Sequence, residues 1–358
     1  MSALEIRKCL VCKGDKKAKP EWQNLGFGKI FTDHMFMMDY DDGKGWHSPQ
    51  ILPYGPLPLD PASMIFHYGQ AVFEGMKAYR SPEGKILLFR PQENFKRLNK
   101  SDDRMCIPHI DEAFALKALI ELLKIEADWV PTVPNTALYI RPFVFATQPS
   151  LGVNTSLSYK FLIILSPVGS YYAAGLQPVN ILVEDEYVRT VRGGIGTAKA
   201  SANYATSLKS QQKAVKNGYA QVLWLDGLER KYIDEVGTMN VFFLINEELV
   251  TPELNGSILP GITRASVIQL AKYWGVNVSE RRLSINEIFV AAENDSLKEA
   301  FGCGTAAVIT PIKAFYMGGK SVQVADGCTG SFAQKLYDQL TGIQCGKIAD
   351  PFGWSYPI

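Results

Sequence analysis

Hydrophobic positions recur along the chain with two different spacings. Residues 111–129 place apolar side chains such as Leu119 and Leu123 three or four positions apart, which predicts a helix with one buried face. Residues 160–168 are apolar almost throughout, which predicts a strand buried within the protein. Because segments of both kinds alternate along the chain, the sequence predicts a mixed α/β (α+β) protein.

The other predicted elements continue this alternation. Strands are predicted at residues 85–89, 137–147, 179–190, 220–226 and 276–281, with a hairpin at 239–254. Helices are predicted at residues 204–217, 263–274, 285–293 and 331–340. Since several strands are joined by hairpins, the sheets need not be parallel.

A connection rich in glycine, aromatic residues and proline, GSYYAAGLQP, follows residue 168. Such a composition marks a link between elements, so we place a domain boundary there. The predicted division is an N-terminal domain of residues 1–169, a connecting loop of residues 170–177 and a C-terminal domain of residues 178–358. A chain of 358 residues with 47% hydrophobic composition is long enough for two domains with substantial cores.

The charges are nearly balanced, with 37 basic and 36 acidic residues and no run of one sign. This composition favours neither a nucleic acid nor an anionic membrane as partner, so we expect a small-molecule ligand. Residues 1–20 lack the apolar core of a signal peptide, and no apolar run approaches membrane-spanning length. The sequence therefore predicts a soluble cytoplasmic protein.

The six cysteines are too few for a disulfide framework in a chain of this length, which fits a reducing compartment. Cys9 and Cys12 form a CxxC pair that could be redox-active or supply half of a zinc site. Because no second CxxC and no HxxxH follows, a near-terminal pair of thiols without a role is the favoured interpretation, and no metal is expected.

The segment GTAKASANY, residues 196–204, sets Lys199 among small residues. A nucleotide P-loop requires GxxxxGK[ST], and the dinucleotide pattern GxGxxG fails because its last position is Lys199. Small neighbours leave room for a flat ring beside the lysine and let the backbone approach it. A desolvated, neutral lysine amine is a nucleophile, so covalent chemistry with pyridoxal 5'-phosphate is the natural candidate.

Pyridoxal phosphate needs three further contacts, and the sequence offers candidates for each. Tyr204 is five residues beyond the lysine and can reach the ring hydroxyl, and Glu235 is the best placed carboxylate for the pyridine nitrogen. The motif LPGITR predicts a helix start whose backbone N–H groups at Ile262 and Thr263 could hold the phosphate, with Thr305 as a further donor. Each feature alone also has an ordinary structural explanation, but their combination favours the cofactor.

The motifs GTAKASANY, EVGTMN, LPGITR and FGCGTA, in that order, resemble the branched-chain amino-acid aminotransferases among the fold-type IV pyridoxal phosphate enzymes. HYGQAVFEGMKAYR and LYIRPFVFATQPSLGV extend the resemblance through the first half, so it covers nearly the whole chain. The resemblance implies a two-domain fold, similar to D-amino-acid aminotransferase, with the smaller domain first and the cofactor-binding domain second. It also implies a homodimer or a higher homo-oligomer.

The resemblance assigns roles to individual residues. Lys199 would carry the cofactor as a Schiff base, Tyr204 would contact the ring hydroxyl and Glu235 the pyridine nitrogen. The other cofactor contacts implied are Arg97, Arg189, Ile262, Thr263 and Thr305. The substrate contacts implied are Phe27, Tyr68, Phe73, Tyr139, Arg141, Tyr171, Thr238 and Ala306, with Leu151 and Val153 reaching the neighbouring subunit's site.

The activity implied is reversible amino transfer from L-leucine, L-isoleucine or L-valine to 2-oxoglutarate, giving the 2-oxo acid and L-glutamate. Lys199 would move the proton, pyridoxamine phosphate would be the intermediate form of the cofactor, and double-displacement kinetics should follow. Two alternatives remain open, a D-amino-acid aminotransferase and a non-catalytic protein that binds pyridoxal phosphate.

The sequence departs from the family's mammalian members in one segment. Where those members carry a CxxC redox switch after their FGSGTA motif, this chain has residues 307–310, AVIT, without a cysteine. We therefore expect no thiol switch at that place and expect Cys303, in the preceding turn, to serve in packing.

Overall fold

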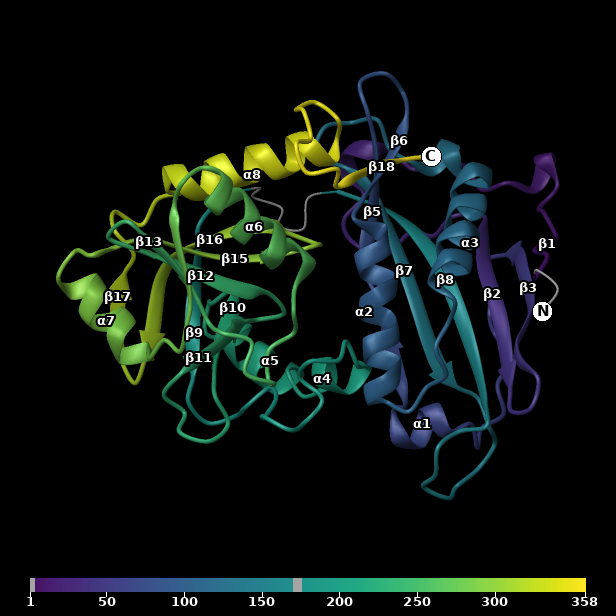
Figure 1. The fold of residues 1–358 in the computed structure, drawn as a ribbon, viewed down its shortest axis with the longest axis horizontal. Helices are drawn as coiled ribbons and strands as arrows, with labels where there is room; N and C mark the ends of the chain where they lie inside the picture. The colour runs from purple at the N-terminus through teal and green to yellow at the C-terminus, as the bar shows by residue number, and fades with distance from the viewer. Residues whose placement is uncertain (1–3, 170–175) are drawn as a thin grey trace. The chain divides into compact units, whose positions relative to one another are not determined.

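The computed structural model describes residues 4–169 and 176–358, which form two compact units (Figure 1). Within these residues, the first unit contains 4–169, 198–201 and 342–358, and the second contains 176–197 and 202–341. The units therefore interleave along the chain, whereas the division expected from the sequence was continuous. The short segment that carries Lys199 belongs to the first unit.

The first unit is built on one mixed sheet. The strands that the structure describes in it are β1 (Arg7–Lys8), β2 (His34–Asp41), β3 (Gly45–Pro53), β4 (Ala71–Phe73), β5 (Met76–Arg80), β6 (Ile86–Phe89), β7 (Ala137–Ala146), β8 (Ser158–Val168) and β18 (Ser355–Pro357). Their order is β1-β3-β2-β8-β7-β5-β6-β18, with β4 paired to β7. Only the pairing of β1 with β3 is parallel among these. The pairing of β18 with β6 places residues 355–357 in this unit.

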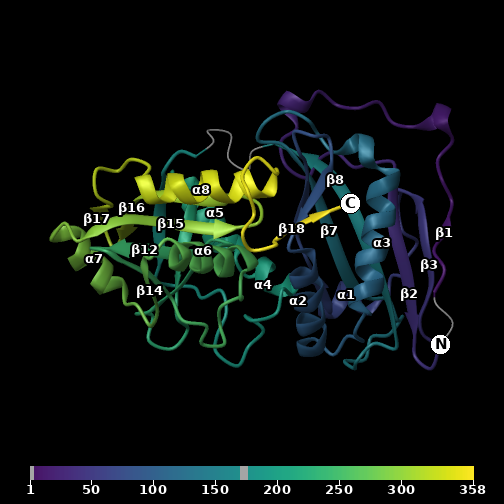
Figure 2. The ribbon, with the colours of Figure 1, turned by 45° about the horizontal axis from the view of Figure 1, so that its top comes forward.

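Two long helices cover one face of this sheet (Figures 1 and 2). They are α2 (Pro91–Arg104) and α3 (Glu112–Ile125), and α1 (Met64–Tyr68) is a single short turn of helix. Side chains such as Leu98 and Leu122 pack with sheet residues such as Ile140 in one apolar core. Short 3-10 helices lie at Lys13–Asp15, Trp22–Asn24 and Ala127–Trp129.

The helix predicted over residues 111–129 ends earlier than expected. Asp111 caps α3, because its side chain accepts a hydrogen bond from the Phe114 N–H at 2.6 Å. After Ile125 the chain tightens into the 3-10 turn, where the carbonyl of Ala127 accepts a hydrogen bond from Arg80. A long-range contact therefore ends the helix, and its local apolar spacing could not indicate that end.

The second unit is built on another mixed sheet. The strands described in it are β9 (Val179–Glu184), β10 (Gln221–Leu225), β11 (Ile233–Val236), β12 (Asn240–Ile245), β13 (Glu248–Thr251), β14 (Asn277–Glu280), β15 (Leu297–Gly304), β16 (Val308–Met317) and β17 (Lys320–Gln323). Their order is β11-β10-β9-β16-β15-β12-β13-β14, with β17 paired to β16. Strand β9 is parallel to both neighbours, and the β12–β13 hairpin is antiparallel. The predicted mixed α/β fold is confirmed.

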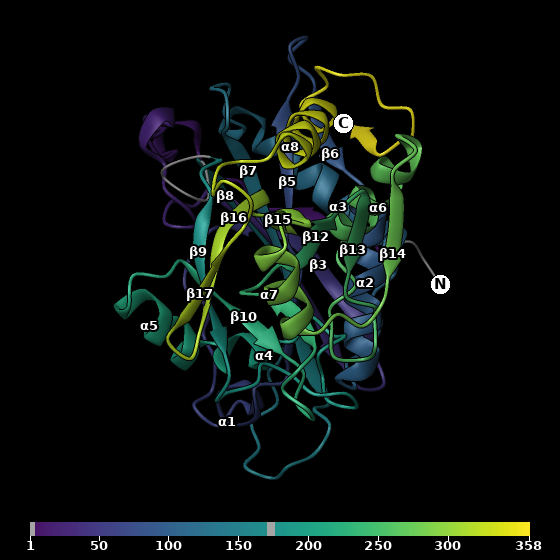
Figure 3. The same cartoon turned by 90° about the vertical axis from the view of Figure 1, so that its left-hand side faces the viewer.

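The second unit contains all or most of the residues of α4 (Ser201–Ala205), α5 (Leu208–Lys216), α6 (Ile262–Tyr273), α7 (Ile285–Glu293) and α8 (Ser331–Gln344). Ser201 of α4 and residues 342–344 of α8 belong to the first unit. Figure 3 shows α7 in front of the sheet, and Ile285 and Ile288 of this helix join the apolar core that the sheet residues form. Among the described residues, none of the helices is both long and apolar enough to cross a membrane.

Two predicted elements in this unit are interrupted. The strand predicted at 179–190 ends at Glu184, whose side chain accepts hydrogen bonds from the backbone N–H groups of Glu186 and Tyr187 and so turns the chain. The helix predicted at 204–217 is divided into α4 and α5, because the hydroxyls of Thr206 and Ser207 donate to nearby backbone carbonyls. Such side-chain bonds compete with the helical ladder.

Candidate active site

The backbone of Lys199 is held from both sides within the first unit. Its N–H donates to Ser101 Oγ at 2.9 Å, and its carbonyl accepts from the Phe73 N–H at 3.0 Å. The next residue, Ala200, forms an antiparallel bridge with Val72. These contacts join the lysine segment to α2 and to strand β4, although more than 90 residues of sequence separate Lys199 from Ser101.

Two cations share one aromatic ring near the lysine. Lys199 Nζ lies 5.1 Å from the ring centroid of Phe73, and the guanidinium carbon of Arg141 lies 4.6 Å from the same centroid. Arg141 Nη2 donates to the Tyr139 hydroxyl at 3.0 Å. The buried Nε of Arg141 has no hydrogen-bond partner among the described residues, so the side chain retains a donor that suits an anionic group.

Two aromatic side chains pack together beside Arg141. The ring of Phe27 meets the ring of Tyr139 edge-on, with 5.0 Å between the centroids. Gly75 lies so close that a Cβ atom there would collide with the Tyr139 hydroxyl. The glycine of the FEG sequence is therefore needed for this phenol to stay in place, a requirement that the sequence analysis did not identify.

Strand β5 also buries a lysine that the sequence analysis missed. Lys77 pairs in register with Tyr139 across the β5–β7 ladder. Burial lowers the pKa of Lys77 to about 8, while the nearby Cys345 acts in the opposite direction. An amine with a lowered pKa therefore lies on the strand next to the predicted substrate residues.

Arg97, predicted to hold the cofactor phosphate, is paired with a buried carboxylate in the structure. Its Nε and Nη2 atoms donate to Glu74 Oε1 and Oε2 at 2.8 and 2.9 Å, and Asn94 donates to Oε2 at 2.7 Å. Burial opposes ionisation of Glu74, but the charge and hydrogen bonds of Arg97, together with the charge of Lys199, hold the pKa of Glu74 below its usual value. Glu74 is a residue of this site that the sequence analysis missed.

Glu235 is anchored in the second unit by two polar side chains. Arg189 Nη1 donates to its Oε2 atom at 2.5 Å, and Asn240 Nδ2 donates to Oε1 at 3.2 Å and to the Leu259 carbonyl at 3.0 Å. Glu235 and Arg189 are both buried. The guanidinium of Arg189 also lies 5.6 Å from the ring centroid of Tyr204. The predicted carboxylate, cation and phenol of the cofactor site are thus brought together in this unit.

The predicted phosphate cradle is the start of helix α6. Its N-cap residue, Gly261, has an extended backbone and makes no side-chain cap hydrogen bond. A Cβ atom at this position would collide with Asn240 Oδ1, so a larger residue would displace the side chain that binds Glu235. The first N–H groups of a helix have no partner inside the helix and favour anions, which suits Ile262 and Thr263 to a phosphate.

The register of the second sheet places two predicted turns at the same end. Asn240 pairs with Cys303 across β12 and β15. Thr238 lies in the turn just before Asn240, and Thr305 lies in the turn just after Cys303. Ala306 lies in the same turn as Thr305. Burial raises the pKa of the Cys303 thiol to about 12, so this cysteine occupies a packing position.

The remaining predicted substrate residues are more exposed. The Tyr68 hydroxyl donates to the Leu151 carbonyl, and the side chains of Leu151 and Val153 are 71% and 79% exposed. Tyr171 lies outside the described residues.

Cys9 and Cys12 are exposed free thiols.

The predicted residues fall into two groups. The first unit contains Phe27, Tyr68, Phe73, Arg97, Tyr139, Arg141, Leu151, Val153 and Lys199. The second unit contains Arg189, Tyr204, Glu235, Thr238, Ile262, Thr263, Thr305 and Ala306. The first group offers the amine and an anion-binding cation, and the second offers a paired carboxylate and a helix start, so the chemistry of each group fits pyridoxal phosphate.

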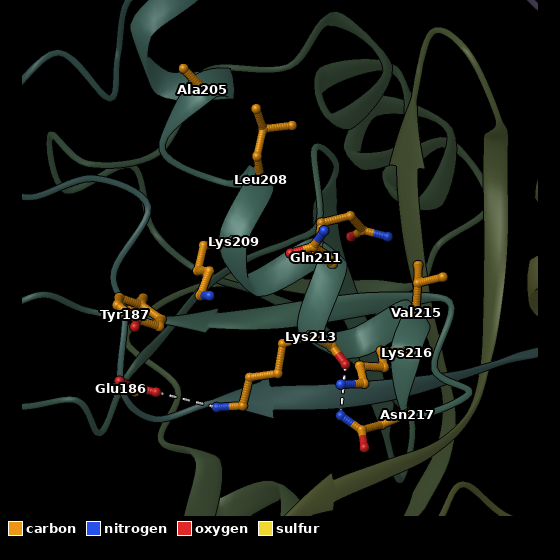
Figure 4. A pocket seen from close by; sticks show the side chains of 11 residues that line it. Glu186, Tyr187, Ala205, Leu208, Lys209, Gln211, Lys213, Val215, Lys216 and Asn217 are labelled. Atoms are coloured by element: carbon orange, nitrogen blue, oxygen red, sulfur yellow. Dashed lines mark hydrogen bonds and ion pairs between the residues drawn. The ribbon is translucent and has the colours of Figure 1, made fainter.

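A surface depression on the second unit includes none of these residues (Figure 4). Helix α5 supplies most of its lining, and Lys213 forms an ion pair with Glu186 at 3.5 Å at its edge. Its exposed side chains include Leu208 and Val215.

Comparison with known proteins shows similarity over nearly the whole chain. The family model described as amino-transferase class IV matches residues 71–315. Branched-chain-amino-acid aminotransferase 2 of Bacillus subtilis (strain 168) is 58% identical over 343 residues, which cover 96% of this chain and 94% of that relative.

Two solved structures share the fold. The branched-chain amino acid aminotransferase of Escherichia coli, 28% identical, covers 90% of this chain and 98% of its own, with a TM-score of 0.76. The branched-chain amino acid aminotransferase of Thermobaculum terrenum, solved in its PLP-form, is 23% identical and covers 90% of this chain and 97% of its own, with a TM-score of 0.71.

Proposed function

The chain belongs to the class IV aminotransferases, and on that premise we propose that it is a branched-chain amino-acid aminotransferase that uses pyridoxal 5'-phosphate. The observation that carries the proposal is the similarity to branched-chain aminotransferases over almost the full length of both chains. The anchored lysine segment between Ser101 and Phe73 supports it, because the reaction requires an amine held in a fixed place.

The substrates proposed are L-leucine, L-isoleucine or L-valine as donors and 2-oxoglutarate as acceptor. One site must accept an apolar branched side chain and, in the other half-reaction, the γ-carboxylate of glutamate. The rings of Phe73, Phe27 and Tyr139 provide apolar contact for the first. Arg141, with its Nη2 atom on the Tyr139 hydroxyl, provides a charged donor for the second.

We propose that Lys199 holds the cofactor and that Arg97, Ile262, Thr263 and Thr305 bind its phosphate. Tyr204 would donate to the ring oxygen, and Glu235 would keep a proton on the ring nitrogen, with Arg189 fixing the orientation of Glu235. When bound, pyridoxal phosphate supplies an electron sink for the carbanion at the substrate Cα.

Lys199 is the residue proposed to move the proton. With its amine free, Lys199 would take the proton from the substrate Cα as a general base and would deliver it, as a general acid, to the cofactor carbon that carries the aldehyde. The two backbone hydrogen bonds described above limit the movement of the lysine peptide, while the side chain itself remains half-buried. The geometry therefore favours a lysine whose backbone is held in place while its side-chain amine can move.

A second copy of this chain is the proposed macromolecular partner. Leu151 and Val153 are large apolar side chains with most of their surface exposed, and the Tyr68 hydroxyl holds the backbone of their loop at Leu151. Exposed apolar side chains on a fixed loop are typical of an interface. We propose that this loop contacts a neighbouring subunit in a homodimer or a higher homo-oligomer.

The test of the proposed function is glutamate formation from 2-oxoglutarate by the purified protein with pyridoxal phosphate. L-leucine, L-isoleucine and L-valine should each act as donors, whereas D-alanine should not. Turnover with D-alanine would instead indicate a D-amino-acid aminotransferase. A bound cofactor without turnover of any donor would indicate a binding protein.

A further inference from the structure

Helix α2 presents a buried polar stripe within the first unit. Asn94, Arg97 and Ser101 are three and four positions apart, so they lie on one face of the helix. Asn94 and Arg97 bind Glu74, and Ser101 binds the backbone of Lys199. A stripe of polar side chains on a helix that otherwise packs into an apolar core calls for a function other than packing.

Ser101 connects the two residues proposed to hold the opposite ends of the cofactor. Its hydroxyl donates to the Arg97 carbonyl at 3.0 Å and accepts from the Lys199 N–H at 2.9 Å. A hydroxyl has one donor and two acceptor sites, so it makes both bonds at once. Ser101 is fully buried, and water therefore does not compete for either bond.

A second connection runs through two adjacent residues of the chain. Phe73 donates its N–H to the Lys199 carbonyl, and Glu74 binds the Arg97 guanidinium through two hydrogen bonds. Lys199 and Arg97 are thus joined by two routes, one through Ser101 and one through the Phe73–Glu74 peptide. Such a closed network leaves little freedom in the separation of the lysine backbone from the arginine.

We propose that Ser101 is a positioning residue that sets the spacing between Lys199 and Arg97 to the length of pyridoxal phosphate. The inference rests on the proposed function, in which the lysine binds the aldehyde end and the arginine binds the phosphate end. A rigid ligand held at two points gains affinity from the second contact only when the two points match its length. Loss of the Ser101 hydrogen bonds should therefore weaken the binding of a ligand that uses both points more than the binding of a ligand that uses only one of them.

Three probes separate these contributions in the apo-protein. Pyridoxal phosphate uses both ends, pyridoxal has the aldehyde without the phosphate, and pyridoxamine 5'-phosphate has the phosphate without the aldehyde. In Ser101→Ala, we expect the Kd for pyridoxal phosphate to rise about tenfold and the other two to change less than about twofold. Alanine is favoured in helices, so the variant should fold, and its thermal unfolding checks this.

The control is Ser210→Ala, which removes another buried serine hydroxyl from a helix. Ser210 Oγ has no hydrogen-bond partner among the described residues, so Ser210→Ala should bind all three probes with wild-type affinity. The spacing role would be overturned if Ser101→Ala lost as much affinity for pyridoxal as for pyridoxal phosphate, or as much for pyridoxamine 5'-phosphate as for pyridoxal phosphate. It would also be overturned if the variant lost no affinity for pyridoxal phosphate. Borohydride reduction of the wild-type complex should attach the cofactor to Lys199; failure of that step would overturn the proposed function instead.

Discussion

Glu74 and Asp102 are two buried carboxyl groups of the first unit whose pKa values are shifted in opposite directions. Glu74 is held ionised against its burial by Arg97, with Asn94 as a further donor. Both side-chain oxygens of Asp102 have no hydrogen-bond partner among the described residues, and burial followed by the charge of Glu74 raises its pKa well above the usual 3.8. Asp102 therefore keeps its proton to a higher pH than Glu74 does.

The raised pKa of Asp102 predicts a loss of stability as pH rises. The folded protein binds this proton more tightly than the unfolded chain, so its stabilising effect is complete below the usual pKa of 3.8 and is lost as pH rises towards the folded pKa. Asp102→Asn removes this dependence, so its stability relative to the wild type should be greater at pH 8 than at pH 5. Urea unfolding at pH 5 and pH 8 measures it, and an equal difference at both values would refute it.

Glu74→Gln should destabilise the protein, because it leaves the buried guanidinium of Arg97 without a counter-charge. Breaking a buried pair typically costs about 3–5 kcal/mol. The pKa of Glu74 is lowered, so its contribution is present above the unfolded value and is lost as pH falls through the folded pKa. The difference from wild type, measured by urea unfolding, should therefore shrink in acid.

The control for Glu74→Gln is Glu93→Gln on helix α2, the helix that carries Arg97. Glu93 forms an exposed ion pair with Lys96 at 3.0 Å, and pairs in contact with solvent contribute little to stability. A loss in Glu93→Gln as large as that in Glu74→Gln would contradict the importance given to burial.

Lys199→Ala should abolish measurable transamination. Removing the proposed general base alone should cost about 10²–10⁴ in rate, and the covalent attachment of the cofactor is lost as well. Lys209→Ala, on α5, should retain wild-type turnover, since Lys209 is exposed and lies in the surface depression. Steady-state glutamate formation compares the two, and similar activities would remove the assignment of Lys199.

Glu235→Gln should slow both half-reactions, because a neutral amide does not hold a proton on the ring nitrogen and leaves Arg189 without its ion pair. The rate loss should be at least about 10²-fold in each direction. Single-turnover absorbance changes with L-leucine and with 2-oxoglutarate measure the two half-reactions separately. The control is Glu229→Gln, which removes a surface ion pair with Arg282. A normal rate in Glu235→Gln would exclude the proposed role.

Elements with strong local signals could be predicted from the sequence. Helix α7 has the predicted bounds Ile285–Glu293, because Ser284 caps it by accepting from the Glu287 N–H at 3.1 Å and its apolar side chains recur at helical spacing. Strand β7 ends one residue before the predicted limit. In these segments the local preference and the packing agree.

Contacts between residues far apart in the sequence could not be predicted from local patterns. The bridge between Val72 and Ala200 attaches the lysine segment to the first unit, and no local pattern indicates that partner. The role of Glu74 was missed for the same reason, since a carboxylate after a short strand acquires its meaning only when Arg97 lies beside it. The resemblance identified Arg97 itself, but the roles of both residues at the cofactor stay predictions.

The interleaving of the two units has a consequence for synthesis on the ribosome. Strand β4 gains the lysine segment only after residues 198–201 have been made, and β6 gains its neighbour β18 only after residues 355–357 have emerged. All of residues 202–341, the bulk of the second unit, are translated in between. The first unit therefore begins to form first and is completed last, and a nascent chain that stops short of β18 exposes the edge of β6 to other chains.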